Sequence, residues 1–280
     1  MTMNEMMMSL EMGLIYGIVA LGIYLTFRII DFPDLTCDGS FVLGAAASSI
    51  LIKSGYNPWF SLVVAIFAGG MAGFLTAILH TKFKVTQLLS GILTSFMLYS
   101  INLHVMGGIP NITLMNSRVI FTEMPIITLL VISLAICIIV TYLLMTDFGL
   151  ALRSVGQNKR LAQNSGINVL SMTTIGLMFS NAIIALGGAL FSQQQGFADV
   201  GSGIGTVIVG LASVMIGERM VPSKSIFVQC ISCLLGSMIY RVLISFALHS
   251  DTLGIATQDL NLLTGIMVVV IMYLPKRQAC

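Results

Sequence analysis

Several stretches of this sequence are apolar over the length needed to cross a lipid bilayer, which is about 20 residues for a helix. Such runs cover residues 10–27, 59–79, 125–145 and 226–248. Only 9% of the residues are charged and 57% are hydrophobic, whereas soluble domains carry about 25% charged residues. The apolar runs do not alternate with a period of two, so the spans are predicted to be helices. The chain is therefore predicted to be an all-α polytopic membrane protein with a single transmembrane domain over residues 1–280.

The number of helices is predicted as eight to ten transmembrane or part-spanning segments. Two of the candidates, 41–52 and 207–217, are short for a full crossing. The N-terminus lacks a Lys/Arg-rich region, so the first apolar run is expected to be retained as a span. The predicted segments are 10–27, 41–52, 59–79, 85–106, 125–145, 173–191, 207–217, 226–248 and 260–274, with an extramembrane loop at 107–124.

A polar interruption, Asp31 to Gly39, follows the first span and contains three carboxylates and a proline. These groups cannot face lipid without a large cost, so they line an aqueous cavity, pack inside the protein or lie at the surface. Asp31, Asp34 and Asp38 could together bind a hard cation. No histidine joins them, and the sequence predicts no metal site.

The long polar stretch near the middle of the chain, residues 147–169, lies between two apolar runs. A turn is predicted at Gly156–Asn158, followed by a short helix at 159–164, and Gly166 supplies a helix stop. A small amphipathic helix that carries Lys and Arg is either a docking surface for a cytoplasmic partner or an ordinary charged loop.

The same stretch follows the pattern G-x-A-x-R-x-x-G-x-N-x-x-x-A-x-x-x-G-I, from Gly149 to Ile167. This pattern resembles the coupling-loop signature of ABC-importer permeases of the branched-chain amino acid and ribose class. The resemblance implies that the short helix docks into a groove on an ATPase subunit. The residues it assigns to coupling are Arg153, Gly156, Asn158, Lys159, Arg160, Ala162 and Gly166.

The resemblance extends to two other parts of the chain. Members of the family have a polar break after the first span, often with an Asn-Phe-Ala-His-Gly string. Here the string is Leu35-Thr36-Cys37-Asp38-Gly39, without the histidine. A glycine-rich hinge follows the sixth span in the family, and residues 192–206 are polar and glycine-dense; a surface turn is the other interpretation. The translocation-pathway candidates are Asp38, Gln193, Gln194 and Gly196.

The distribution of positive charge predicts the orientation, because cytoplasmic loops carry an excess of Lys and Arg. If the coupling loop is cytoplasmic and nine segments alternate, all 13 Lys and Arg except Lys53, Arg118 and Arg241 fall on the cytoplasmic side. The N-terminus is then outside and the C-terminus is cytoplasmic.

The chain carries no G-x-x-x-x-G-K-[ST] phosphate-binding loop and no recognisable catalytic motif. It is therefore predicted not to be an enzyme and to bind no cofactor, with ATP and Mg held by a partner ATPase. The net charge of +2 gives no indication of nucleic-acid binding. The spans hold no Asp, Glu or Lys near their middles, which favours an externally powered permease over an ion-coupled transporter.

These features predict the permease subunit of an ATP-driven ABC importer in the bacterial cytoplasmic membrane, moving a small polar solute, with an amino acid as the first expectation. The implied partners are ABC ATPase subunits, a second permease copy or paralogue, an extracytoplasmic solute-binding protein and the lipid bilayer. The alternative is an ion-coupled secondary transporter or channel that works without an ATPase.

Overall fold

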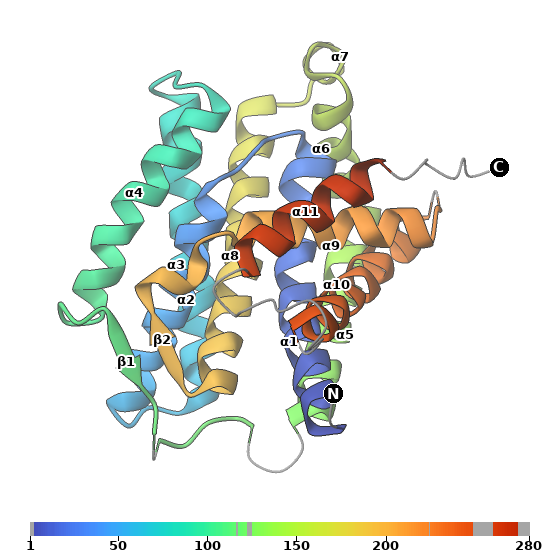
Figure 1. The fold of residues 1–280 in the computed structure, drawn as a ribbon. Coiled ribbons are helices and arrows are strands. Elements are labelled where there is room, and N and C mark those ends of the chain that lie inside the picture. Colours follow the sequence, from blue (N-terminus) through green and yellow to red (C-terminus); the bar gives the residue numbers. More distant parts are fainter. Residues whose placement is uncertain (1–2, 116, 122–124, 224, 249–259, 274–280) are drawn as a thin grey trace.

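The computed structural model describes residues 3–115, 117–121, 125–223, 225–248 and 260–273, which form a bundle of helices with one short two-stranded ribbon (Figure 1). In chain order the elements are α1 (Met3–Ile23), the π-helical η1 (Tyr24–Ile30), α2 (Thr36–Lys53), α3 (Pro58–Thr81), α4 (Gln87–Val105), β1 (Asn111–Thr113), α5 (Pro125–Met145), α6 (Asp147–Gln157), α7 (Lys159–Asn164), α8 (Val169–Gln195), β2 (Phe197–Asp199), the 3-10 helix η2 (Val200–Gly203), α9 (Thr206–Met220), α10 (Ile226–Leu248) and α11 (Leu260–Tyr273).

The membrane helices agree with the predicted all-α polytopic fold. Among the described residues, seven helical stretches are long and apolar enough to cross a membrane. The shorter helices α2 and α11 add two further segments, which brings the set within the predicted range of eight to ten. In Figure 1 the start of α1 and the short helix α7 lie at opposite ends of the bundle.

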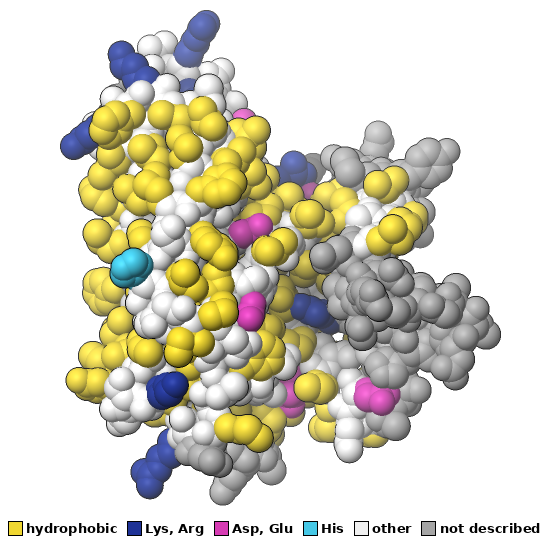
Figure 2. All heavy atoms as spheres, turned by 60° about the vertical axis from the view of Figure 1, so that its left-hand side comes forward, with side chains coloured by type: hydrophobic (Ala, Val, Ile, Leu, Met, Phe, Trp, Pro, Cys, Tyr) yellow, Lys and Arg dark blue, Asp and Glu magenta, His cyan; other side chains and the backbone are white. Residues whose placement is uncertain are grey.

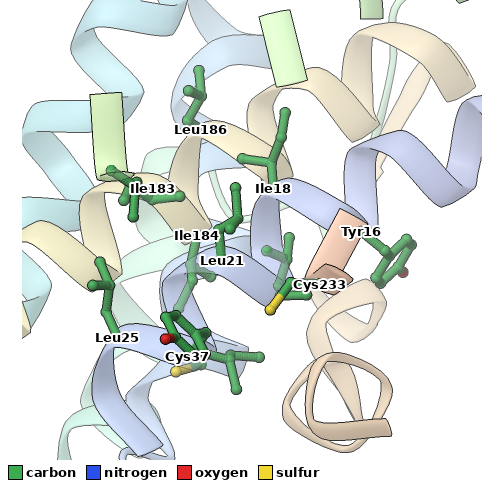
Figure 3. Close-up of a cluster of buried hydrophobic side chains, with 14 of the residues drawn as sticks. Tyr16, Ile18, Leu21, Leu25, Cys37, Ile183, Ile184, Leu186 and Cys233 are labelled. Atoms are coloured by element: carbon green, nitrogen blue, oxygen red, sulfur yellow. The ribbon is translucent and has the colours of Figure 1, made fainter. Parts of the chain in front are cut away.

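Helix α1 lies in the centre of the bundle, and all its residues from Glu11 to Ile23 are buried. Glycines of α1 allow close packing against a neighbouring helix. A Cβ atom at Gly13 would lie 2.8 Å from Met238 Cα, and one at Gly17 would lie 2.8 Å from a Leu234 methyl group. Helix α10 therefore approaches α1 at near-backbone distance. Figure 3 shows part of the resulting core, with side chains from α1, η1, α2, α8 and α10: Tyr16, Ile18, Leu21, Leu25, Cys37, Ile183, Ile184, Leu186 and Cys233.

Helix α8 packs against α2 through glycines of both helices and against α3 through glycines of α3. A Cβ atom at Gly44 of α2 would fall on the carbonyl oxygen of Ala185, and one at Gly188 of α8 would fall on that of Phe41. Gly69 of α3 meets the carbonyl oxygen of Asn181 in the same way. Small residues of this kind allow membrane helices to approach closely, where dispersion contacts replace the hydrophobic effect.

The outer faces of α3, α4 and α5 carry the large exposed apolar side chains that a lipid-facing surface needs, among them Phe67, Phe96 and Tyr142. In the left-hand part of Figure 2, hydrophobic side chains cover the middle height, and Lys and Arg lie at the upper and lower ends. This distribution matches a hydrocarbon band between two polar interfaces.

Two sequence-based boundaries were wrong. Gly156 and Gln157, predicted as part of a turn, lie in the last turn of α6, where the close contact of Gly156 with η1 holds the helix. Helix α8 does not end at residue 191 but continues to Gln195. Hydropathy falls at Ser192, but glutamine is a good helix former, so the change in polarity does not end the helix.

The ribbon between β1 and β2 was not predicted. Its antiparallel register pairs Asn111 with Asp199 and Thr113 with Phe197. The ribbon ties the loop after α4 to the chain that follows α8, at the end of the molecule opposite α7 (Figure 1).

The packing of α3 on α8 generates a matched test, because Gly69 and Gly70 are adjacent but differ in surroundings. A Cβ atom at Gly69 would collide with Asn181 backbone, whereas one at Gly70 would have its nearest neighbour at 3.8 Å. Gly69→Ala is expected to destabilise the detergent-solubilised protein by about 1–3 kcal/mol through overpacking, and Gly70→Ala is expected to be neutral. Thermal unfolding of both variants measures the difference; equal stability would contradict the packing.

Candidate functional site

The short helix predicted at 159–164 is present as α7, and local hydrogen bonds define both its ends. The Asn158 side-chain oxygen accepts from the amides of Arg160 and Leu161, both at 3.1 Å, which satisfies two free donors of the first turn. At the other end Gly166 has φ +82°, and its amide donates to the carbonyl of Gln163 at 3.0 Å. Asn158 and Gly166 therefore fix the two ends of the helix, and both are themselves exposed.

The two faces of α7 differ in what they contact. Ala162 is buried in a small apolar cluster with Val155 of α6 and Val169 of α8. Lys159 and Arg160 are exposed, and Leu161, which was not among the predicted coupling residues, is 64% exposed. The signal for Leu161 was available, since it is an apolar residue within a polar helix. Ala162 thus holds the inner face of α7 against α6 and α8. The outer face presents two cations and one apolar side chain at one end of the molecule.

Helix α6 joins α7 rigidly to the end of the first span. Gly156 lies so close to η1 that a Cβ atom there would fall on the carbonyl oxygen of Ile29. Arg153, another coupling candidate, is half-buried on α6, and its Nε has no hydrogen-bond partner in the described part of the chain. Helix α6 therefore contacts both α7 and η1, which has the wide π-helical turn often found at functional positions.

From η1, two side-chain contacts continue towards α9 and α10. Arg28 binds Glu218 in bidentate fashion, with Nε donating to Oε1 at 2.7 Å and an η nitrogen donating to Oε2 at 2.9 Å. The Tyr24 hydroxyl donates to Gln229 Oε1 at 2.6 Å. Helices α6, α9 and α10 thus meet around η1, at the end of the first span.

A buried polar network lies beneath this region, in the break between η1 and α2. Asp34 is fully buried, and its carboxylate accepts from the Thr36 amide at 2.9 Å and from the Asn181 side chain at 2.7 Å. The Ser40 hydroxyl donates to the oxygen of the same Asn181 side-chain amide at 2.7 Å. Of the three interpretations of the break, packing inside the protein holds for Asp34. Its partner Asn181 was not singled out from the sequence, because nothing local to α8 marks it.

Asp38 caps α9 and so joins α2 to a helix that follows much later in the chain. Its carboxylate oxygens accept from the backbone amides of Val207 at 2.9 Å and Gly205 at 3.3 Å. The Asp38 carboxylate lies at the N-terminal end of α9, where a negative charge is favourable. Asp34 and Asp38 therefore have separate partners and do not form one cluster with Asp31.

The other three pathway candidates lie together at the end of α8, with different roles. Gln193 is 2% exposed; its amide nitrogen donates to Ser48 and Ser61 hydroxyls at 3.1 and 3.3 Å. Gln194 Nε2 donates to Glu11 Oε2 at 2.6 Å. Gly196 has φ +74° and ends α8. Gln193 is thus an anchor between helices, and Gly196 supplies a turn.

A cavity of about 660 Å³ lies beside these residues, between the β-ribbon, the loop before α5 and the end of α8. Its walls include Asn111, Phe121, Gln194 and Phe197. The cavity lies at the end of the molecule opposite α7, since the 27 residues of α8 span roughly 40 Å between the two. The described structure therefore has two candidate functional regions, the exposed face of α7 and this cavity.

Comparisons with known proteins bear on the family to which the chain belongs. The sequence matches the family described as branched-chain amino acid transport system / permease component over residues 6–274. It is 40% identical to the tyrosine transport system permease protein of Clostridioides difficile, over 95% of this chain and 90% of that protein. It is 26% identical to the nucleoside ABC transporter permease protein NupC of Lactococcus lactis, over 65% of each chain.

The fold is shared with a solved structure, PsaBC from Streptococcus pneumoniae in complex with Fab. The TM-score is 0.59 with 14% sequence identity, over 98% of this chain and 91% of that one. At this identity the likeness concerns the fold alone. The family match covers nearly the whole chain, and the chain belongs to the family of permease components of branched-chain amino acid transport systems.

Proposed function

We propose that this chain is the membrane subunit of an ATP-driven importer in which α7 is the coupling helix. The observation that carries the proposal is the structure of α7, whose inner face is locked to α6 and α8 while Lys159, Arg160 and Leu161 are exposed. A groove on an ATPase subunit that contacts these three side chains would bind the helix by charge and by apolar burial. ATP and Mg would be held by the ATPase.

A conformational change of the ATPase on ATP binding would be transmitted to the transmembrane helices through the backbone contact between α6 and η1. Closure of two ATPase subunits would displace α7, and α6 would transmit the displacement to η1 at the Gly156–Ile29 contact. The Arg28–Glu218 ion pair would carry it to the end of α9. A two-state bundle biased by contacts at one end has the form that allosteric switching requires.

The solute is proposed to be an amino acid. The support is the 40% identity to a permease named for tyrosine transport; the weaker match to a nucleoside permease makes nucleosides the competing solute class.

A second copy of this chain or a paralogue would complete the pathway, and an extracytoplasmic binding protein would deliver the solute. The proposed location is the bacterial cytoplasmic membrane. Membership of an ABC permease family counts against the ion-coupled alternative.

The exposed Leu161 allows a test of the ATPase contact. Leu161→Asp would place an unpaired charge in the proposed interface and weaken ATPase binding by at least about tenfold. The measurement is affinity purification of the chain from its native membrane with quantification of the P-loop ATPase that copurifies. ATP-driven uptake is expected to fall in parallel.

Phe83→Asp provides the control, because Phe83 is 69% exposed in the α3–α4 turn at the same end of the molecule but outside α7. The control is expected to retain the ATPase. Retention of the ATPase by the Leu161 variant would exclude α7 as the docking helix. Absence of any ATPase from the wild-type preparation would favour the ion-coupled alternative.

The Arg28–Glu218 pair gives a second test of the coupling route. Because both side chains are partly exposed, such a pair contributes at most about 1 kcal/mol. Arg28→Glu and Glu218→Arg alone are each expected to lower ATP-driven uptake by about two- to fivefold, with thermal stability nearly unchanged. The swapped double variant is expected to recover uptake. Additive losses in the double variant would show that the pair does not act as a unit.

The proposed orientation, with an outside N-terminus and a cytoplasmic C-terminus, is testable by labelling. In a background with Cys280 replaced by serine, the remaining cysteines are buried. Lys159→Cys is expected not to react with a membrane-impermeant maleimide in intact cells, and Tyr56→Cys, in the α2–α3 turn, is expected to react. The reverse pattern would invert the protein in the membrane.

A further inference from the structure

Two cysteines on different helices meet between α5 and α10. The buried residues on the inner face of α5 recur at helical spacing: Leu129, Ser133, Cys137, Val140, Thr141 and Leu144. Cys137 is 1% exposed, and Cys230 of α10 is fully buried. Their thiols are close enough to form a hydrogen bond with each other. The structure therefore holds a pair of free thiols between two helices that are far apart in the sequence.

Cys233 is the other cysteine near Cys230, one turn further along α10, and it lies in the core shown in Figure 3. Residues three apart on a helix have Cβ atoms about 5–6 Å apart, whereas a disulfide needs about 3.5–4.5 Å between them. A bond between Cys230 and Cys233 would therefore deform α10. Cys137, which approaches from another helix, is the better partner for Cys230.

The chemical environment of the pair differs from that of Cys37, which is also buried. The Cys37 thiol donates to the carbonyl oxygen of Asp34 at 3.1 Å, and such an acceptor keeps the proton on the sulfur. In the pair, one thiol can donate to the sulfur of the other, which favours the thiolate that reacts with oxidants. Cys137 and Cys230 are therefore better suited to oxidation than Cys37.

The pair lies beside the joint between α6 and η1. Gln229, the residue before Cys230, accepts a hydrogen bond from the Tyr24 hydroxyl of η1 at 2.6 Å. On the other side, α5 continues into α6 with only Thr146 between the two helices. A covalent bond between Cys137 and Cys230 would thus fasten the helix that leads into α6 and α7 directly to α10.

We propose that Cys137 and Cys230 form a disulfide on oxidation, and that this bond stops the ATP-driven cycle by fixing α5 to α10. The oxidant is a hydroperoxide that is apolar enough to enter the bilayer. One thiolate takes the OH group of the hydroperoxide as the O–O bond breaks, which gives a sulfenic acid, and the alkoxide leaves with the thiol proton as an alcohol. The second thiol attacks the sulfenic sulfur, which closes the disulfide and releases water.

One hydroperoxide thus accepts two electrons from the two thiols. The effect on the cycle rests on the proposed importer function, whereas the formation of the disulfide does not.

The first measurement maps the disulfide. Cys280, which lies outside the described residues, is replaced by serine, and membranes that contain the protein are treated with tert-butyl hydroperoxide. Peptide mass spectrometry, after unfolding and alkylation of the remaining thiols, is expected to find Cys137 joined to Cys230, with Cys37 and Cys233 alkylated. A disulfide between Cys230 and Cys233, or alkylation of all four thiols, would overturn the inference.

The second measurement follows ATP hydrolysis by the same protein copurified with its ATPase in lipid nanodiscs. Oxidation is expected to lower the rate by about fivefold or more, and dithiothreitol is expected to restore it. Cys137→Ala and Cys230→Ala are each expected to hydrolyse ATP as fast after oxidation as before it. The matched control is Cys233→Ala, which removes a buried thiol from the same helix and is expected to keep the sensitivity to oxidation.

Two results would refute the effect of the disulfide on the cycle. One is a disulfide formed in full yield without any loss of hydrolysis. The other is a loss that persists in Cys137→Ala and Cys230→Ala, which would place the sensitive thiol elsewhere. Absence of a copurifying ATPase would instead refute the importer function, and the peptide map would still decide whether the disulfide forms.

Discussion

The close approach of α8 to its neighbours is the constraint on which the rest of the molecule depends. In lipid, helices gain little from the hydrophobic effect and associate through packing and polar contacts. Gly44, Gly69 and Gly188 remove the side chains that would otherwise separate α2, α3 and α8, so that backbone lies on backbone. This contact holds both ends of α8 in place. One end supports α7, and the other forms a wall of the cavity (Figure 1).

Polar groups inside the bundle hold the irregular backbone that glycine contacts alone would not orient. Asp34 joins the break after η1 to Asn181 in the middle of α8, and Asp38 joins α2 to the start of α9. A buried polar group that loses its partner is costly, so these bonds specify one arrangement of the discontinuous segments. The two carboxylates therefore have a structural role in the discontinuous segments around the first break.

The two candidate regions lie at opposite ends of the bundle and are built in a similar way. At the α7 end the residues of the family pattern mainly build the helix: Asn158 caps it, Gly166 ends it and Ala162 anchors it. The exposed contacts come from the residues between them. At the other end, Gln193 and Gly196 likewise build the site, and Gln194 alone among the pathway candidates of α8 presents an unsatisfied group. In each region, therefore, most of the predicted residues shape the backbone, and few of them are placed to contact a partner or a solute.

The sequence by itself determined the membrane class, the positions of the spans, the break after the first span and the short helix with its stop. These features depend on local hydropathy and on side chains that bond backbone within a few residues. Only the tertiary structure decided that α6 is helical through Gly156, that Asp34 pairs with Asn181, that Asp38 caps α9 and that Glu11 orients Gln194. In the three side-chain contacts the partners are more than 140 residues apart. Such contacts depend on how the helices cross, and the hydropathy of a helix does not predict which of its faces contacts which neighbour.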